Sequence, residues 1–316
     1  MTREALVMKT IAMLAVLFTG ASLLARDERG GQPTFRSNAE LVVLHVSIRD
    51  RGGHYVADLP QEAFTVIDDG RPQQLTMFSA EDVPASIGFL VDNSNSMRPS
   101  RDRVVAASVA FAKSAHPQDE IFVLTFNEAV RAAFGPMEAA KIDPAAFARA
   151  MNQAIVARGM TAIYDGLAAG LSRLEQARHT RQVLIVVSDG DDNASHEQLD
   201  DVMRKVRESD ATVYTIALID PLVRGGDAGF LRRLARSTGG EAYEPRRVED
   251  MPDAFDKIAK DIRSAYTLAW TPLNSGEQAA DRRRHTVRVY VHAPDGRPLH
   301  VRARDGYFDN SRESRQ

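Results

Sequence analysis

The chain has 316 residues, of which 44% are hydrophobic and 26% charged. This composition is typical of a globular protein of about two domains, and it excludes a wholly disordered, collagen-like or coiled-coil chain. The formal net charge of −3 predicts no nucleic acid partner, and the absence of cysteine excludes disulfides, thiolate zinc sites and thiol catalysis.

An apolar run at residues 11–25 follows Arg3 and Lys9 near the N-terminus. Its length and flanking charges predict a secretory signal peptide over residues 1–25, and it is short for a membrane span. We therefore expect an exported protein, periplasmic or extracellular, with no membrane span after signal cleavage. An uncleaved anchor or a buried helix is the alternative. Residues 26–38 are predicted to be a polar leader outside the folded part.

Alternating apolar residues at both ends of the remaining chain predict half-buried strands. Neither end is large enough to bury its apolar face alone, so we expect the two ends to pack together. Residues 39–83 and 265–309 are therefore predicted to be the halves of one small β-sandwich-like domain, followed by a tail at 310–316. The alternating positions are Val42, Leu44, Val46, Ile48, Phe64, Val66, Val287, Val289, Val291, Leu299, Val301 and Ala303.

Residues 84–264 have a different pattern and are predicted to be a domain inserted between those halves. Continuous apolar runs, typical of strands covered on both faces, alternate with segments of helical spacing. This alternation predicts an α/β fold with a doubly wound, mainly parallel sheet and a functional site at the carboxyl ends of its strands. The runs are residues 87–91, 121–126, 183–187 and 213–218, and the helical stripes include Val104, Ala107 and Phe111, Leu167, Leu171 and Leu174, and Phe255, Ile258 and Ile262.

Three polar clusters lie just past apolar runs or at a helix start in the inserted domain. Asp92, Ser94 and Ser96 follow the first run, Thr161 opens a helix, and Asp189 follows the third run. Carboxylate and hydroxyl oxygens are hard ligands, suited to magnesium, manganese or calcium rather than to zinc or copper. Two carboxylates and three hydroxyls do not saturate such an ion, so a position remains for water or for an acidic group from outside.

The order Asp-x-Ser-x-Ser, then a distant Thr after Gly-x, then Ser-Asp-Gly resembles the von Willebrand factor A-type (VWA) domain with its metal-ion-dependent adhesion site (MIDAS). The resemblance covers the whole inserted domain and implies a Rossmann-like fold. In that family two serines and a threonine coordinate the metal, and by resemblance these are Ser94, Ser96 and Thr161. Asp92 and Asp189 would act directly or through water. The implied cofactor is Mg²⁺, with Mn²⁺ or Ca²⁺ as alternatives.

The flanking segments resemble a bacterial, acidobacterial-type subgroup of exported VWA proteins. Trp270 stands where this subgroup leads us to expect Tyr, a departure that bears on packing rather than on the metal. The matching features are Asp50, Gly52, Leu59, Phe64, Val66 and Asp68-Asp69-Gly70 before the inserted domain, and Tyr266-Thr-Leu-Ala-Trp-Thr-Pro and Val301-Arg-Ala-Arg-Asp-Gly-Tyr after it.

The resemblance implies an exported, metal-dependent adhesion or interaction module rather than an enzyme. Its cation would accept an Asp or Glu carboxylate of a partner protein. An envelope structural or assembly protein without a metal-dependent ligand is the alternative. A phosphotransferase is disfavoured because Asn193 stands where its motif needs Thr or Val, and a hydrolase because the sequence has no Gly-x-Ser-x-Gly elbow.

Simpler explanations exist for several of these polar residues. Residues 92–100 are also typical of a turn followed by a helix cap. Asp191 and Asp192 are expected to be solvated loop acids, since Ala194 stands where a calcium loop needs Gly. The basic run at residues 282–284 is expected to be a solvated turn.

Overall fold

The computed structural model describes residues 41–219, 226–272 and 283–308. The predicted signal peptide, polar leader and tail lie outside these residues, as does Arg282 of the basic run. Within the described ranges, every helix is too short or too polar to cross a membrane.

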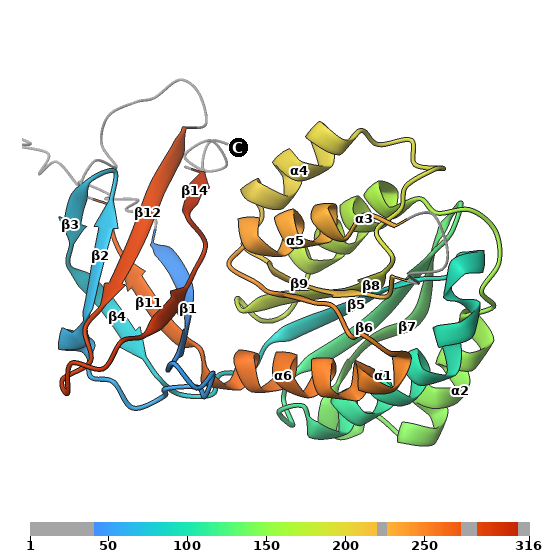
Figure 1. Ribbon diagram of the computed structural model, residues 1–316, viewed down its shortest axis with the longest axis horizontal. Helices are drawn as coiled ribbons and strands as arrows, with labels where there is room; N and C mark the ends of the chain where they lie inside the picture. Colours follow the sequence, from blue (N-terminus) through green and yellow to red (C-terminus); the bar gives the residue numbers. More distant parts are fainter. Residues whose placement is uncertain (1–40, 220–225, 273–282, 309–316) are drawn as a thin grey trace, which may run out of the picture. The chain divides into compact units, whose positions relative to one another are not determined.

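A six-stranded sheet forms the centre of the inserted domain (Figure 1). Its strands are β5 (Ser86–Asp92), β6 (Glu120–Phe126), β7 (Val130–Glu138), β8 (Gln182–Ser188), β9 (Thr212–Ala217) and β10 (Ala242–Tyr243). Their spatial order is β10-β9-β8-β5-β6-β7, and all neighbours run parallel except β6 and β7. The four apolar runs correspond to β5, β6, β8 and β9. The predicted α/β fold with a mainly parallel sheet is confirmed.

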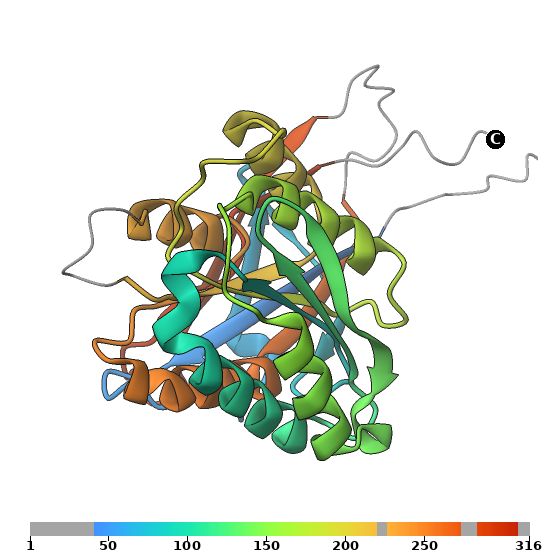
Figure 2. The same ribbon diagram turned by 90° about the vertical axis from the view of Figure 1, so that its right-hand side faces the viewer.

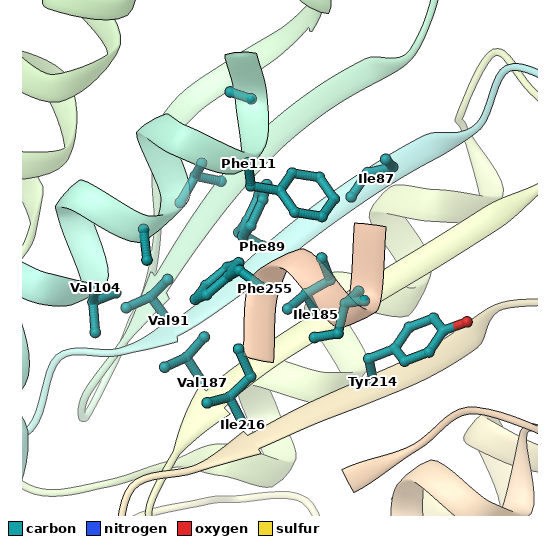
Figure 3. Close-up of a cluster of buried hydrophobic side chains, with 14 of the residues drawn as sticks. Ile87, Phe89, Val91, Val104, Phe111, Ile185, Val187, Tyr214, Ile216 and Phe255 are labelled. Carbon is teal, nitrogen blue, oxygen red and sulfur yellow. The ribbon is translucent and has the colours of Figure 1, made fainter. Parts of the chain in front are cut away.

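Helices cover both faces of this sheet, as Figures 1 and 2 show. One face carries α1 (Arg101–Ser114), α2 (Pro144–Ala154) and α6 (Met251–Ser264), and the other carries α3 (Ile163–Glu175), α4 (Leu199–Glu208) and α5 (Ala228–Ser237). On the first face the ring of Phe89 lies 5.2 Å from that of Phe111 and 6.0 Å from that of Phe255 (Figure 3). The three predicted stripes are the buried faces of α1, α3 and α6, which confirms their helical spacing.

Strands from before and after the inserted domain form two four-stranded antiparallel sheets, seen in Figure 1 as blue and orange-red arrows side by side. The first sheet, in spatial order, is β13 (His300–Arg302), β1 (Val42–Arg49), β11 (Tyr266–Trp270) and β4 (Leu75–Ser79). The second is β14 (Gly306–Phe308), β12 (Arg284–Val291), β2 (Phe64–Asp68) and β3 (Arg71–Gln73). Val42 pairs with Trp270, and Val66 pairs with Val289. The two chain ends therefore share one sandwich and one core, as predicted.

Several elements are absent from the sequence-based prediction, above all the edge strand β7. It contains Gly135 and Pro136, and its register against β6 shifts, so its side chains show no sustained alternation. Helix α4 carries an apolar stripe at helical spacing, formed by Leu199, Val202, Met203 and Val206, which the sequence-based prediction does not use.

The basic run differs from its expected solvated turn. Arg284 begins β12, and its guanidinium lies 2.6 Å from the carboxylate of Asp305. Arg283 lies 3.3 Å from the carboxylate of Asp69. The expectation of a turn is wrong for Arg284, because β12 pairs with β14 from its first residue onward, whereas Arg283 is exposed and precedes the strand.

A buried carboxylate joins the inserted domain to the sandwich, and both belong to the same compact unit of the chain. Asp261 of α6 is fully buried and accepts hydrogen bonds from Ser47 of β1 at 2.5 Å and from Tyr214 of β9 at 2.6 Å. Arg302 of β13 donates to the same carboxylate and also to Glu241 at 3.1 Å. Burial, reinforced by the charge of Asp261, raises the pKa of Tyr214 well above its usual value, so this hydroxyl remains a donor.

Candidate metal centre

The first polar cluster lies at the end of β5, where Asp92 is the last residue of the strand. Its carboxylate is fully buried, and Oδ1 accepts a hydrogen bond from the backbone N–H of Ser94 at 2.8 Å. The chain turns here so that the hydroxyls of Ser94 and Ser96 lie 3.0 Å apart. Ser94 is buried and Ser96 is exposed, so the two hydroxyls lead from the sheet edge towards the surface.

The serines of this cluster do not cap helices. Ser94 precedes the 3-10 helix Asn95–Ser100, and Ser100 precedes α1, but neither side chain makes a capping hydrogen bond. The alternative explanation of the motif as a turn and a helix cap is therefore wrong for these serines. The hydroxyls of Ser94 and Ser96 face each other instead.

The second carboxylate enters from β8, which pairs in parallel with β5. Ser188 ends β8, and its hydroxyl donates to Oδ2 of Asp92 at 2.7 Å. Asp189 follows immediately, is half-buried, and accepts a hydrogen bond from the backbone N–H of Asp191 at 3.1 Å. Two strand ends thus bring both candidate aspartates to one edge of the sheet, and Ser188 orients the first of them.

Thr161 lies in the loop before α3 and is buried. Its backbone N–H donates to the side-chain oxygen of Asn193 at 2.8 Å, and its carbonyl accepts from the N–H of Asn193 at 2.9 Å. Two residues earlier, the carbonyl of Gly159 accepts from the N–H of Asn95 at 3.2 Å. These bonds connect the Thr161 loop to both other clusters. Among the described residues, no side-chain hydrogen bond engages the Thr161 hydroxyl.

Comparison with known families decides what kind of domain this is. A family model, the von Willebrand factor type A domain, matches residues 86–257, more than half of the chain. The chain belongs to the von Willebrand factor type A domain family. No curated protein matches the sequence.

Several solved structures are similar to this chain at low sequence identity. A von Willebrand factor type A protein from Catenulispora acidiphila is 13% identical, with a TM-score of 0.50 over 88% of this chain and 76% of that chain. Proximal thread matrix protein 1 from the mussel byssus is 17% identical, with a TM-score of 0.50 over 62% of this chain and 51% of that chain. A further structure of the mussel protein, described with a zinc-occupied MIDAS motif, is 18% identical, with a TM-score of 0.47 over 62% and 49%. The two structures with a TM-score of 0.50 show a shared fold alone, because their sequence identities are low.

The electrostatics of the VWA site favour a cation. Burial raises the pKa of Asp92 to about 6, against the hydrogen bonds from Ser94 and Ser188, and the nearby charge of Asp189 adds to the rise. Among the described residues, Asp92 has no ion-pair partner. The candidate donors are all oxygen atoms, two carboxylates and three hydroxyls, and this set fits a hard divalent cation.

Asn93, which the sequence analysis does not single out, fastens the loop beside the VWA site. Its side-chain oxygen accepts from the N–H groups of Val156 at 2.7 Å and Ala157 at 2.6 Å, and its amide donates to the carbonyl of Ala154 at 3.0 Å. Since Asn93 is buried, Asn93→Ala leaves three backbone groups without partners, and we expect the free energy of unfolding to fall by about 2–3 kcal/mol. Urea denaturation followed by circular dichroism measures this loss.

Asn152→Ala is the matched control, because Asn152 is exposed and donates only to the carbonyl of Ala148 within α2. We expect its effect to stay within about 0.5 kcal/mol. If both variants lost the same free energy of unfolding, Asn93 would not be the residue that holds this loop in place.

Asp192 differs from the expected solvated loop acid. Its Oδ1 accepts from the backbone N–H of Ile163 at 3.0 Å and from the hydroxyl of Ser195 at 2.5 Å. The N–H of Ile163 is one of the unpaired donors at the start of α3, so Asp192 satisfies that helix end from a loop 29 positions away. A contact at such a sequence separation leaves no local signal.

Proposed function

We propose that this VWA protein is an exported interaction module that binds an acidic side chain of a partner protein through a divalent cation. One observation carries the proposal. The hydroxyls of Ser94 and Ser96 lie 3.0 Å apart, free of helix capping, beside the buried carboxylate of Asp92, which has no cationic partner among the described residues. Export rests on the predicted signal peptide alone.

In this proposal the cation is Mg²⁺, with Mn²⁺ or Ca²⁺ as alternatives. The residues that would hold it are Asp92, Ser94, Ser96, Thr161 and Asp189. Bound there, a cation supplies a coordination position that a carboxylate from outside can occupy. Asp92 is itself held in place by the N–H of Ser94 and the hydroxyl of Ser188. The site would recognise its ligand without converting it.

The surface beside the site suits an acidic ligand with an apolar neighbour. The side chains of Arg98 and Arg158 are exposed on the loops that carry the candidate ligands, and they favour the approach of negative charge. Met160 and Val156 are 49% and 53% exposed in the same region. We therefore expect the affinity to come from the metal-bound carboxylate together with contacts to these side chains.

Two measurements on the full chain test the function. Isothermal titration is expected to show binding of Mg²⁺ to the native chain and no heat with the double variant Ser94→Ala/Ser96→Ala. Both chains are then used as bait in an envelope extract, with magnesium or with chelator. A partner retained by the native chain in magnesium alone, and lost when its contacting Asp or Glu is changed to the amide, supports the proposal.

Equal heats in the native chain and the double variant would remove the metal from this function. Capture that is insensitive to chelator would instead favour the envelope assembly alternative. Exposed apolar side chains on the sandwich favour that alternative, because they offer a contact surface that needs no metal. Val43 and Met77 are exposed, and both pair with Ala269 on neighbouring strands.

A further inference from the structure

A second cluster of metal-ligating side chains lies in the sandwich, away from the VWA sheet. Asp68 ends β2, Asp69 begins the turn after it, and His285 lies in the paired strand β12. One donor atom of each residue lies within 4.8 Å of the other two. Nδ1 of His285 is 3.2 Å from Oδ2 of Asp69 and 3.8 Å from Oδ1 of Asp68.

The carboxylate of Asp68 is divided between a satisfied and an unsatisfied oxygen. Oδ2 accepts from Nε1 of Trp270 at 3.0 Å and from the hydroxyl of Tyr307 at 2.8 Å. Oδ1 has no hydrogen-bond partner among the described residues, and water does not reach it freely because the side chain is only 4% exposed. A buried carboxylate oxygen without a partner is costly, so its persistence calls for a ligand.

The surrounding contacts fix all three donors. Oδ1 of Asp69 accepts from the backbone N–H of Thr286 at 2.9 Å, which turns Oδ2 towards His285. The imidazole of His285 stacks on the ring of Tyr307, with centroids 4.7 Å apart and planes at 7°. In each carboxylate, the oxygen that would not bind the metal accepts hydrogen bonds, and the imidazole is held by stacking. Metal ligands in known sites are oriented by supporting contacts of this kind.

We propose that Asp68, Asp69 and His285 form a second cation site that takes a first-row transition dication such as Zn²⁺. Two ligand atoms at about 2.1 Å from one metal lie about 3.0–3.4 Å apart at octahedral or tetrahedral angles. The Asp69–His285 distance of 3.2 Å falls in this range, and the Asp68–His285 distance of 3.8 Å lies just above it. One imidazole nitrogen with two carboxylate oxygens favours zinc over magnesium or calcium.

One neighbouring cation competes for this site. The guanidinium of Arg283 lies 3.3 Å from Oδ2 of Asp69, but its side chain is 67% exposed and can leave without breaking a buried contact. Asp69 itself is 24% exposed and His285 15%, so solvent reaches the cluster from that side. A bound dication would connect β2 to β12 and stabilise the sandwich by mass action.

The single tryptophan of the chain reports on this site directly. Trp270 is fully buried, and its indole N–H donates to the carboxylate that would hold the metal. Zn²⁺ titrated into the full chain is therefore expected to give a saturable change in tryptophan emission. The same change is expected in the Ser94→Ala/Ser96→Ala variant, which lacks the proposed VWA metal site.

The variants His285→Gln and Asp69→Asn are expected to weaken this zinc response at least tenfold. The Asp69→Asn side chain keeps an oxygen acceptor for the N–H of Thr286, so this variant is expected to fold. It tests the zinc site if circular dichroism shows that His285→Gln is unfolded. His292→Gln, an exposed histidine at the end of the same lobe, is the matched control and should respond like the native chain. An unresponsive native chain, or an unchanged zinc affinity in Asp69→Asn, would overturn the proposal.

Discussion

Asp261→Ala is expected to lower the free energy of unfolding by about 3 kcal/mol or more. The carboxylate is fully buried where α6 meets the sandwich, and it accepts from Ser47, Tyr214 and Arg302. Removing it leaves two buried hydroxyls without their acceptor and takes from Arg302 one of its two carboxylate partners, the other being Glu241. A buried donor left without an acceptor costs about 1–3 kcal/mol, and the two hydroxyls together account for an effect of this size.

Thermal unfolding followed by circular dichroism measures the loss, and for a chain of this length we expect the midpoint to fall by about 6–12 °C. Asp256→Ala is the matched control on the same helix, because Asp256 is exposed and pairs with Lys260 on the surface. Its midpoint should move by no more than about 2 °C. Similar unfolding midpoints for Asp256→Ala and Asp261→Ala would show that the contacts of Asp261 do not stabilise the packing of the VWA domain against the sandwich.

In the presence of chelator, Asp92→Asn is expected to be more stable than the native chain at neutral pH. Burial raises the folded-state pKa of Asp92 from 3.8 to about 6, so the folded chain holds this proton more tightly than the unfolded chain does. Between these two values the free energy of unfolding contributed by this group falls as the pH rises, and above pH 6 the loss is complete. A shift of about 2 units corresponds to about 3 kcal/mol.

The test compares melting temperatures of the native chain and Asp92→Asn at pH 4 and pH 7, with chelator and with Mg²⁺. In chelator, the native chain should lose stability between the two pH values relative to the variant, because asparagine does not ionise. Magnesium should raise the melting temperature of the native chain and leave that of the variant unchanged. Asp102→Asn, an exposed aspartate on α1, serves as control. A magnesium effect that survives in Asp92→Asn would argue against Asp92 as a ligand.

The parts of the fold that could be predicted are those in which a local pattern carries the information. The short apolar run at residues 87–91 is typical of a strand covered on both faces, and the Asp92 cluster directly follows it in the sequence. The sandwich could be predicted because each half alone is too small to be stable. Edge strand β7 could not, since an edge needs only one apolar face and its register is irregular.

The contacts that support the site are beyond local patterns. Asn93 forms hydrogen bonds with backbone groups 61–64 positions away in the sequence. Asp261 accepts a hydrogen bond from the hydroxyl of Ser47, which is 214 positions away. Spacing along the chain predicts that polar residues gather at strand ends, but it does not say which of them bind one another. The carboxylate of Asp68 is a further example, because the donors to its Oδ2, Trp270 and Tyr307, come from the opposite end of the chain.

The pairing of Val42 with Trp270 has a kinetic consequence. As an unstructured loop, the chain between these two residues would cost roughly 5 kcal/mol of closure entropy through its length alone. Once the VWA domain has folded, its two ends are held near each other and most of that entropy has already been lost. We therefore expect the sandwich to assemble after the VWA domain has folded and to unfold before it.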